Sequence, residues 1–374
     1  MLWLTGLILL VAAFLVSVIL CAVIRRTARR LGFVDRTGHR KLQERPVALG
    51  GGVGLFLTTA GIVVAGMALA HSGGLLESLP WLPAVIREHL PDIVQRTEVV
   101  LFVLGGAAVM FALGFMDDVR PLSPWTRLAV QVLTAGLIWM FSEELRLTAF
   151  VAHKGVSLTY TILWVVGITN AFNLLDNADG LSAGVAAIAS LAFLVVAALT
   201  HQFFVAALLS VFIGSLAGFL VFNFPPASLF MGDAGSMFVG YVVAVVAILL
   251  TYYIPGHGHN PLGAMLAPVV ILAVPIYDTL SVVVIRLSQG RSIFSGDRNH
   301  FSHRLMELGM RKTSAILTIY LVTLCTGLLA PLLLWVKPVL SLLILANVAL
   351  MLVLIWLLEH AGRRGRLAGE RDAR

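Results

Sequence analysis

Four polar side chains recur at every third position where the sequence reads NAFNLLDNADG. They are Asn170, Asn173, Asp176 and Asp179. Because each residue of an α-helix turns by about 100°, the two asparagines are neighbours and so are the two aspartates, but all four cannot share one stripe. We therefore predict that the helix ends near Leu174 and that the aspartates lie on a turn closed by Gly180. A polar helix cap is the alternative, although a cap needs only one such residue.

Two further acidic motifs add carboxylates. Asp117 and Asp118 stand side by side ahead of two prolines, and Asp233 stands between glycines in FMGDAGS. Adjacent carboxylates repel each other unless a cation offsets them, and carboxylates together with substrate phosphates suit Mg²⁺. Adjacent residues do not share a helix face, so Asp117 and Asp118 serve one site only where a helix ends. Arg127, about one turn into the next apolar segment, is placed to hold an anionic ligand. Taken alone, Asp233 is equally well explained as a helix N-cap.

Two basic stretches offer partners for phosphate groups. The first, Val34–Gly54, carries Arg40 and Lys41 ahead of a glycine-rich helix start, where backbone amides bind phosphate well. Its alternative is topological charge combined with close helix packing by small residues. The second, Arg286–Lys312, contains His300, His303 and Arg304. This stretch contains no cysteine, and the acidic motifs elsewhere suit a metal that prefers oxygen ligands. We therefore favour histidines that bind or position phosphate over a zinc site. An ordinary solvated loop is the alternative.

The elements that position these residues must be membrane spans. The 374 residues are 59% hydrophobic and 12% charged, whereas soluble domains carry about 25% charged residues. At about 20 residues per span, we predict an all-α polytopic membrane protein of about eleven transmembrane helices. The predicted spans are Leu2–Ile24, Val47–Ala70, Val99–Met116, Trp125–Phe141, Leu158–Leu174, Leu181–Thr200, Phe203–Phe222, Ser236–Ile254, Leu262–Ile285, Ser314–Trp335 and Val339–Leu358.

Lysine and arginine are distributed unevenly between the two sides of this arrangement. One side carries 20 of them and the other carries 5, so the positive-inside rule assigns the first side to the cytoplasm. The N-terminus is then outside, the C-terminus is inside, and 359–374 forms a basic cytoplasmic tail. The acidic motifs and the pair His300 and His303, which were not used in the count, also fall on the cytoplasmic side. We predict one transmembrane domain, 1–374, and no nucleic-acid partner, because the net charge of +7 is explained by topology.

Carboxylates for a hard cation, amides, and basic groups for anions are thus expected at one membrane face. This combination suits phosphoryl-type chemistry on a diphosphate, where positioning and charge neutralisation supply most of the catalysis. A basic loop at the lipid boundary indicates that one substrate is lipid-anchored. A transporter or flippase would need polar groups through the membrane midplane, which this arrangement lacks.

The motifs resemble those of the polyprenyl-phosphate N-acetylhexosamine-1-phosphate transferases, in glycosyltransferase family 4. The similar stretches are MDD at 116–118, NAFNLLDNADGLSAG at 170–184, FMGDAGS at 230–236 and DRNHFSHRL at 297–305. Since every carboxylate position of these motifs is present, the resemblance argues against an inactive relative that acts as a scaffold.

The chain looks like the bacterial branch that uses UDP-N-acetylglucosamine. VPIYDT at 274–279 and RSIFSGDRNH at 291–300 are similar to that branch. The branch that makes peptidoglycan lipid I, a phospho-MurNAc-pentapeptide transferase, usually has PTMGG and consecutive histidines where this chain reads ALGGG and HFSH. The chain departs from the bacterial pattern at Thr37, Gln43 and Ser302, where proline, histidine and histidine are frequent.

The resemblance implies transfer of HexNAc-1-phosphate, most often GlcNAc-1-phosphate, from a UDP-sugar to undecaprenyl phosphate in the bacterial inner membrane, with UMP released and Mg²⁺ or Mn²⁺ as cofactor. The predicted metal ligands are Asp233 and Asn173. The predicted catalytic residues are Asp117, Asp118, Asp176, Asp179 and His300. The predicted substrate-binding residues are Arg40, Lys41, Arg127, Asn170, His303 and Arg304. The lipid I reaction is the alternative, and the oligomeric state, a homodimer included, stays open.

Overall fold

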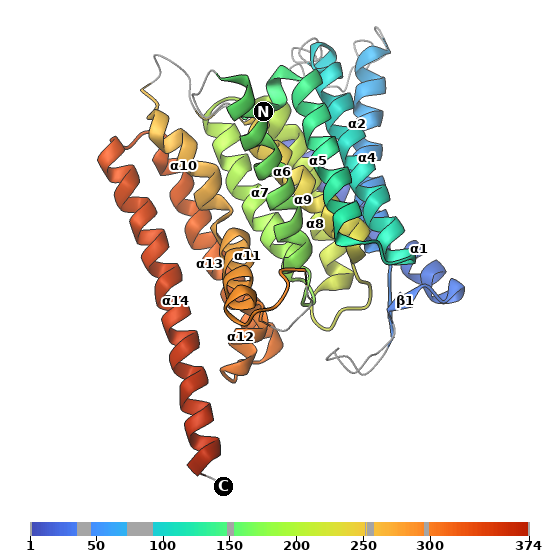
Figure 1. Cartoon of the computed structure of the whole chain (residues 1–374). Coiled ribbons are helices and arrows are strands. Elements are labelled where there is room, and N and C mark those ends of the chain that lie inside the picture. The colour runs from blue at the N-terminus through green and yellow to red at the C-terminus, as the bar shows by residue number, and fades with distance from the viewer. Residues whose placement is uncertain are drawn as a thin grey trace. The chain divides into compact units, whose positions relative to one another are not determined.

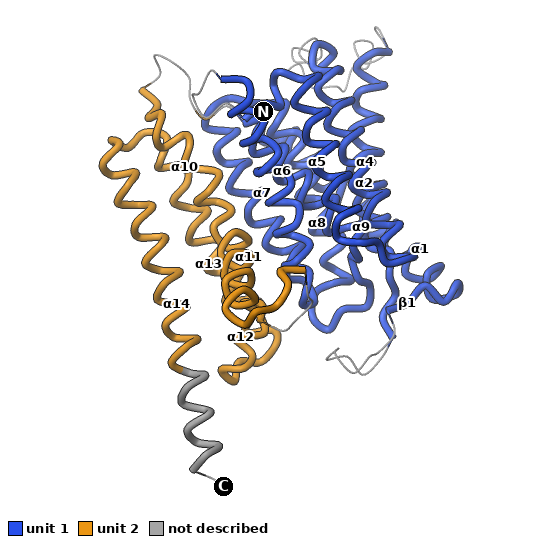
Figure 2. Tube along the Cα trace, viewed as in Figure 1, with its two compact units in different colours: residues 1–251 blue, residues 252–374 orange. Residues whose placement is uncertain are grey.

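The computed structural model describes residues 2–35, 46–72, 93–147, 153–250, 252, 258–294 and 299–372 (Figure 1). These residues are almost entirely helical, which confirms the predicted all-α class. They fall into two compact units, Met1–Thr251 and Tyr252–Arg374 (Figure 2). The single transmembrane domain over 1–374 stays a prediction.

The first unit is built around one deeply buried helix, α9. Its long helices are α1 (Leu2–Leu31), α2 (Gly51–His71), α4 (Thr97–Val119), α5 (Pro124–Phe141), α6 (Lys154–Leu175), α7 (Leu181–Leu199), α8 (Phe203–Asn223) and α9 (Gly232–Leu249). A short 3₁₀ helix, η1 (Glu143–Leu145), follows α5. The apolar window of α9 is 78% buried, against 17% for α1, and α9 packs against α2, α4, α6 and α7. The residues at the start of α9 are therefore reached from several helices at once.

A small hairpin leads into α2. Strands β1 (Val34–Asp35) and β2 (Val47–Ala48) pair antiparallel. Ala48 also forms a bridge with Leu229, and its carbonyl accepts a hydrogen bond from the Phe230 N–H at 2.8 Å. The hairpin thus holds the segment that precedes α9. The predicted phosphate-binding residues Arg40 and Lys41 lie between the two strands, outside the described residues.

The second unit contains a sharply bent helix pair. Its helices are α10 (Pro261–Ile271), α11 (Ala273–Ser288), α12 (Phe301–Glu307), α13 (Lys312–Leu333) and α14 (Pro338–Asp372). The pair α10 and α11 is bent by 66°. Helix α14 continues through most of the segment predicted as a basic tail, so this segment begins as an extension of the last span.

Nine helices in the described parts of the chain are long and apolar enough to cross a membrane, or up to ten if the bent pair is one span. The chain is therefore a multi-pass membrane protein, as predicted. Each predicted span coincides with one of the helices above or with the bent pair. Helix α5 is outside the set of nine, so the count of eleven depends on it and stays a prediction, as does the orientation of the termini.

Candidate active site

The NAFNLLDNADG stretch ends one helix and starts the next. Helix α6 includes both asparagines and ends at Leu175, and α7 begins at Leu181. Between them Gly180 has φ 74°, a left-handed conformation that glycine adopts without strain. The prediction of a helix end here, with both aspartates on the following turn, is confirmed.

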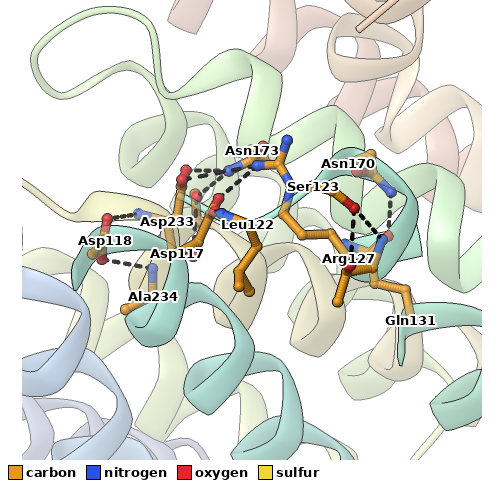
Figure 3. A network of polar contacts seen from close by, with 12 residues as sticks. Asp117, Asp118, Leu122, Ser123, Arg127, Gln131, Asn170, Asn173, Asp233 and Ala234 are labelled. Carbon is orange, nitrogen blue, oxygen red and sulfur yellow. Dashed lines mark hydrogen bonds and ion pairs between the residues drawn. The ribbon is translucent and has the colours of Figure 1, made fainter. Parts of the chain in front are cut away.

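Asn173 and Asp233, the two predicted metal ligands, are hydrogen-bonded to each other (Figure 3). The Asn173 amide donates to Asp233 Oδ1 at 2.7 Å and to Ser236 Oγ at 2.9 Å. These contacts join the end of α6 to the first turn of α9 across 60 residues of sequence. The Asp233 side chain is 37% exposed, so a ligand can reach the carboxylate.

Asp118 uses both carboxylate oxygens on the backbone at the start of α9. Oδ1 accepts the Asp233 N–H at 2.8 Å, and Oδ2 accepts the Ala234 N–H at 3.0 Å. A carboxylate at a helix N-terminus is stabilised by the unpaired amides and the helix dipole. In this geometry Asp118 caps α9 and holds Asp233 in place.

Asp117 is buried and faces Arg127. Its Oδ2 lies 2.7 Å from Arg127 Nη1, and its Oδ1 accepts the Leu122 N–H at 2.5 Å. Arg127 Nη1 is also 3.9 Å from Asp233 Oδ2. The two adjacent aspartates lie in the last turn of α4, which confirms that they occupy a helix end. Arg127 follows a Ser123 cap and a proline that fix the start of α5, and its guanidinium offsets the charge of two carboxylates.

Two other predicted residues have different partners. The Asn170 amide donates to Gln131 Oε1 at 2.6 Å, on the α5 side of the network (Figure 3). Asp179 is 7% exposed, and its Oδ2 accepts the Ala227 N–H at 3.1 Å. Their roles in catalysis and substrate binding stay predictions, while these contacts show that both also hold neighbouring segments.

Sequence reasoning missed two buried amide side chains next to the site. Gln131 is fully buried against Asn170. Asn223, at 2% exposure, accepts the Gly180 N–H and donates to the Leu229 carbonyl, both at 2.9 Å. The available signal was a polar residue inside a predicted span for Gln131 and directly after the end of one for Asn223.

The glycines at the start of α2 serve close packing. The Gly51 and Gly52 amides donate to the carbonyls of Phe230 and Met231 at 2.8 and 2.9 Å. A side chain at Gly52 would lie 2.6 Å from Gly235 Cα. The packing alternative therefore explains these two glycines, because their amides already have backbone partners.

The acidic residues create an excess of negative charge that fits a hard cation. Burial, and then the carboxylates of Asp233, Asp118 and Asp179, raise the pKa of Asp176 to about 8. Within the described residues, no three His, Cys, Asp or Glu side chains form a group that could hold a metal ion. Mg²⁺ commonly takes one or two carboxylates and completes its shell with water and substrate phosphates. Asp233 and Asn173 fit that mode.

The second unit holds the histidine motif. His300 occupies the N-cap position of α12 and is 5% exposed, and its Nδ1 lies 3.0 Å from Asp278 Oδ2. The rings of His300 and His303 have centroids 6.5 Å apart. The two predicted histidines are thus neighbours, and Asp278 is an additional buried partner.

Arg304 has an internal partner that sequence reasoning missed. Its Nε lies 2.8 Å from Glu359 Oε2, and the two side chains are 3% and 4% exposed. Tyr277 donates to the same Glu359 oxygen at 3.4 Å, and the guanidinium lies 5.6 Å from the Tyr277 ring centre. Glu359 directly follows the last predicted span, a position at which a charged residue is expected to be solvated. Substrate binding by Arg304 stays a prediction.

Carboxylates and amides at the ends of packed membrane helices define a multi-pass membrane protein with a polar, cation-compatible site. The family model that matches is "Glycosyl transferase family 4", over residues 100–251, a range that includes the acidic cluster. A "Probable undecaprenyl-phosphate N-acetylglucosaminyl 1-phosphate transferase" of Bacillus subtilis is 31% identical over 324 residues, covering 84% of this chain and 82% of the relative. The chain belongs to glycosyl transferase family 4.

Other relatives differ in how much of the chain they match. A "Decaprenyl-phosphate N-acetylglucosaminephosphotransferase" of Mycobacterium tuberculosis is 32% identical over 320 residues, covering 80% of this chain and 75% of the relative. A "Phospho-N-acetylmuramoyl-pentapeptide-transferase" of Lactiplantibacillus plantarum is 32% identical over 223 residues, covering 55% of this chain and 66% of the relative. The similarity is thus more extensive to the N-acetylglucosaminyl-phosphate transferases.

Proposed function

We propose that the protein transfers GlcNAc-1-phosphate from UDP-GlcNAc to undecaprenyl phosphate and releases UMP. The observation that carries the proposal is the pairing of Asn173 with Asp233, together with Asp117, Asp118 and Arg127, at the ends of helices in a membrane protein. Similarity over 84% and 80% of this chain to transferases named for this sugar and for polyprenyl phosphates supports it.

In the reaction, the phosphoanhydride bond of UDP-GlcNAc is replaced by a new phosphoanhydride bond to the lipid phosphate. An oxygen of the lipid phosphate attacks the sugar-linked phosphorus of UDP-GlcNAc. The bond from that phosphorus to the bridging oxygen breaks, and UMP leaves with this oxygen. A phosphate monoester has a second pKa of about 6, so the nucleophile is mostly ionised at pH 7 and needs positioning more than a strong base.

The residues of the first unit divide this work among them. Asp233 and Asn173 would hold Mg²⁺ or Mn²⁺, which when bound neutralises charge on the diphosphate and on the leaving UMP. Asp118 keeps Asp233 in place through the α9 amides. Arg127 opposes the charge of Asp117 and helps to orient an anionic oxygen. Asp176, on the turn after α6, orients the nucleotide sugar.

The remaining predicted groups complete the proposal. His300 and His303 bind the diphosphate, and Arg40 and Lys41 bind the lipid phosphate. The polar site is cytoplasmic, where UDP-sugars are made, with the N-terminus outside. Single cysteines in the loops, labelled from either side with a membrane-impermeant reagent, test this orientation, and labelling of 34–46 from outside would contradict it.

The reaction is tested with purified protein in detergent, undecaprenyl phosphate and a panel of UDP-sugars. Mass spectrometry of the lipid product identifies the transferred group. We expect undecaprenyl-diphosphate-GlcNAc and one UMP per product, dependent on Mg²⁺ or Mn²⁺. Product from UDP-MurNAc-pentapeptide alone would establish the lipid I reaction, and no product from any UDP-sugar with folded protein would refute the proposal.

A further inference from the structure

Asp278 is a buried carboxylate in helix α11. Its residue is 1% exposed, and an ionisable side chain inside an apolar helix is costly unless it is paired. Its two oxygens have separate partners. Oδ1 accepts the Phe301 N–H at 2.6 Å, and Oδ2 lies 3.0 Å from His300 Nδ1. Asp278 therefore caps the start of α12 through the Phe301 N–H and also holds the ring of His300, the residue at the N-cap position.

This contact determines which nitrogen of His300 carries a proton. An ionised carboxylate only accepts hydrogen bonds, so opposite it the ring presents Nδ1–H to Asp278. Nε2 is then the nitrogen through which His300 acts on a ligand. A partner that fixes the tautomer and orientation of a functional imidazole is a recurrent device in enzymes.

We propose that Asp278 is a positioning residue that holds His300 as the Nδ1–H tautomer and reserves Nε2 for the diphosphate of the nucleotide sugar. The assignment rests on the proposed function, in which His300 binds that diphosphate. Asp278 acts through His300 and through the placement of α12.

The variant Asp278→Asn separates this role from general packing. Asparagine has the same shape but carries one oxygen and one NH₂ group. The Phe301 N–H needs the oxygen, so the NH₂ group faces His300 Nδ1 and donates to it. The proton of a neutral ring must then move to Nε2, which blocks this atom as an acceptor.

The tautomer is measured by ¹⁵N NMR of histidine-labelled full-length protein in detergent micelles, with the His300 signals assigned by their loss in His300→Gln. We expect Nδ1–H in the wild type and Nε2–H in Asp278→Asn. We expect kcat of Asp278→Asn to fall by about 10- to 100-fold, and the same change to have little effect in the His300→Gln background. Thr279→Val is the matched control, since its hydroxyl bonds to the Pro275 carbonyl of its own helix at 2.9 Å, and it should keep the wild-type tautomer and turnover.

The outcomes distinguish this proposal from the proposed function. A wild-type protein that makes no UMP from any UDP-sugar would refute the function, whereas the tautomer measurement would still test the pair. Wild-type His300 with its proton on Nε2 would overturn the positioning role without the need for any variant. An equal loss of kcat with and without His300 would also overturn it, because the loss would then not pass through the histidine.

Discussion

Replacing Gly114 with alanine tests whether the close packing of α4 against α9 sets the geometry of the site. A Cβ at Gly114 would lie 2.6 Å from Ala234 Cα and closer still to the Asp233 carbonyl. Both are backbone atoms at the start of α9. Carbon atoms in contact prefer a separation of at least about 3.5 Å, so the two helices must separate by about 1 Å.

A separation of this size breaks the cap that Asp118 provides. Asp118 lies one turn after Gly114 and binds the Asp233 and Ala234 amides at 2.8 and 3.0 Å. An added 1 Å or so takes these contacts beyond the hydrogen-bond range, and each bond to a charged group contributes roughly 1.5–3 kcal/mol. Misplacing a functional group by about 1 Å costs about 100-fold in rate. We expect UMP release to fall by about that factor and the thermal midpoint to decrease.

The control lies on the same helix. A Cβ at Gly105 meets no atom within 4 Å, and alanine favours a helix over glycine by roughly 0.5–1 kcal/mol. Gly105→Ala should therefore keep wild-type turnover with equal or slightly higher stability. A Gly114→Ala protein with turnover within about twofold of Gly105→Ala would refute the packing argument, with the twofold margin set well below the predicted loss.

Three further predictions concern charge. Because the pKa of Asp176 is raised to about 8, this carboxyl group is largely protonated at pH 7 when no cation is bound. Cation binding should therefore release protons at pH 7 and fewer at pH 9, which calorimetry in two buffers measures. Proton release of equal size in Asp176→Asn would contradict this. Glu359→Gln should destabilise the protein by roughly 3–5 kcal/mol because it leaves the Arg304 charge buried without its partner. The double variant Glu359→Leu with Arg304→Met should recover most of the lost thermal midpoint. Equal midpoints for the single and the double variant would contradict this prediction. Arg127→Gln should reduce kcat by more than about 10-fold, from the loss of a charged hydrogen bond to Asp117, and Arg127→Lys by less; equal losses would show that charge contributes nothing.

Much of the first-unit site follows from the sequence because its signals are local. The four residues Asn170, Asn173, Asp176 and Asp179 cannot all share one helix stripe. Gly180 permits a left-handed turn, so the end of α6 near Leu174 was predictable. Adjacent aspartates ahead of prolines likewise predicted the end of α4. These features depend on neighbouring residues, where helix geometry and turn chemistry suffice.

The partners of the charged side chains were not predictable in the same way. Asp118 caps a helix that begins 114 residues later, and Arg304 pairs with Glu359 across 55 residues. From the sequence, a carboxylate at a helix end is equally consistent with a catalytic group, a cap or a solvated charge. Only the tertiary packing determines which partner it contacts. Asp278 was detectable as an acidic residue in an apolar helix. That its partner is His300 depends on how α11 packs against α12.

The most direct test compares UMP release by wild-type protein and by Asp233→Asn, each folded and supplied with UDP-GlcNAc, undecaprenyl phosphate and saturating Mg²⁺. If Asp233 and Asn173 form the cation and diphosphate site, the wild type releases UMP and Asp233→Asn does so at least about 100-fold more slowly, with an unchanged thermal midpoint. Wild-type rates in Asp233→Asn would contradict the account, because the reaction would then proceed without the carboxylate around which the site is built.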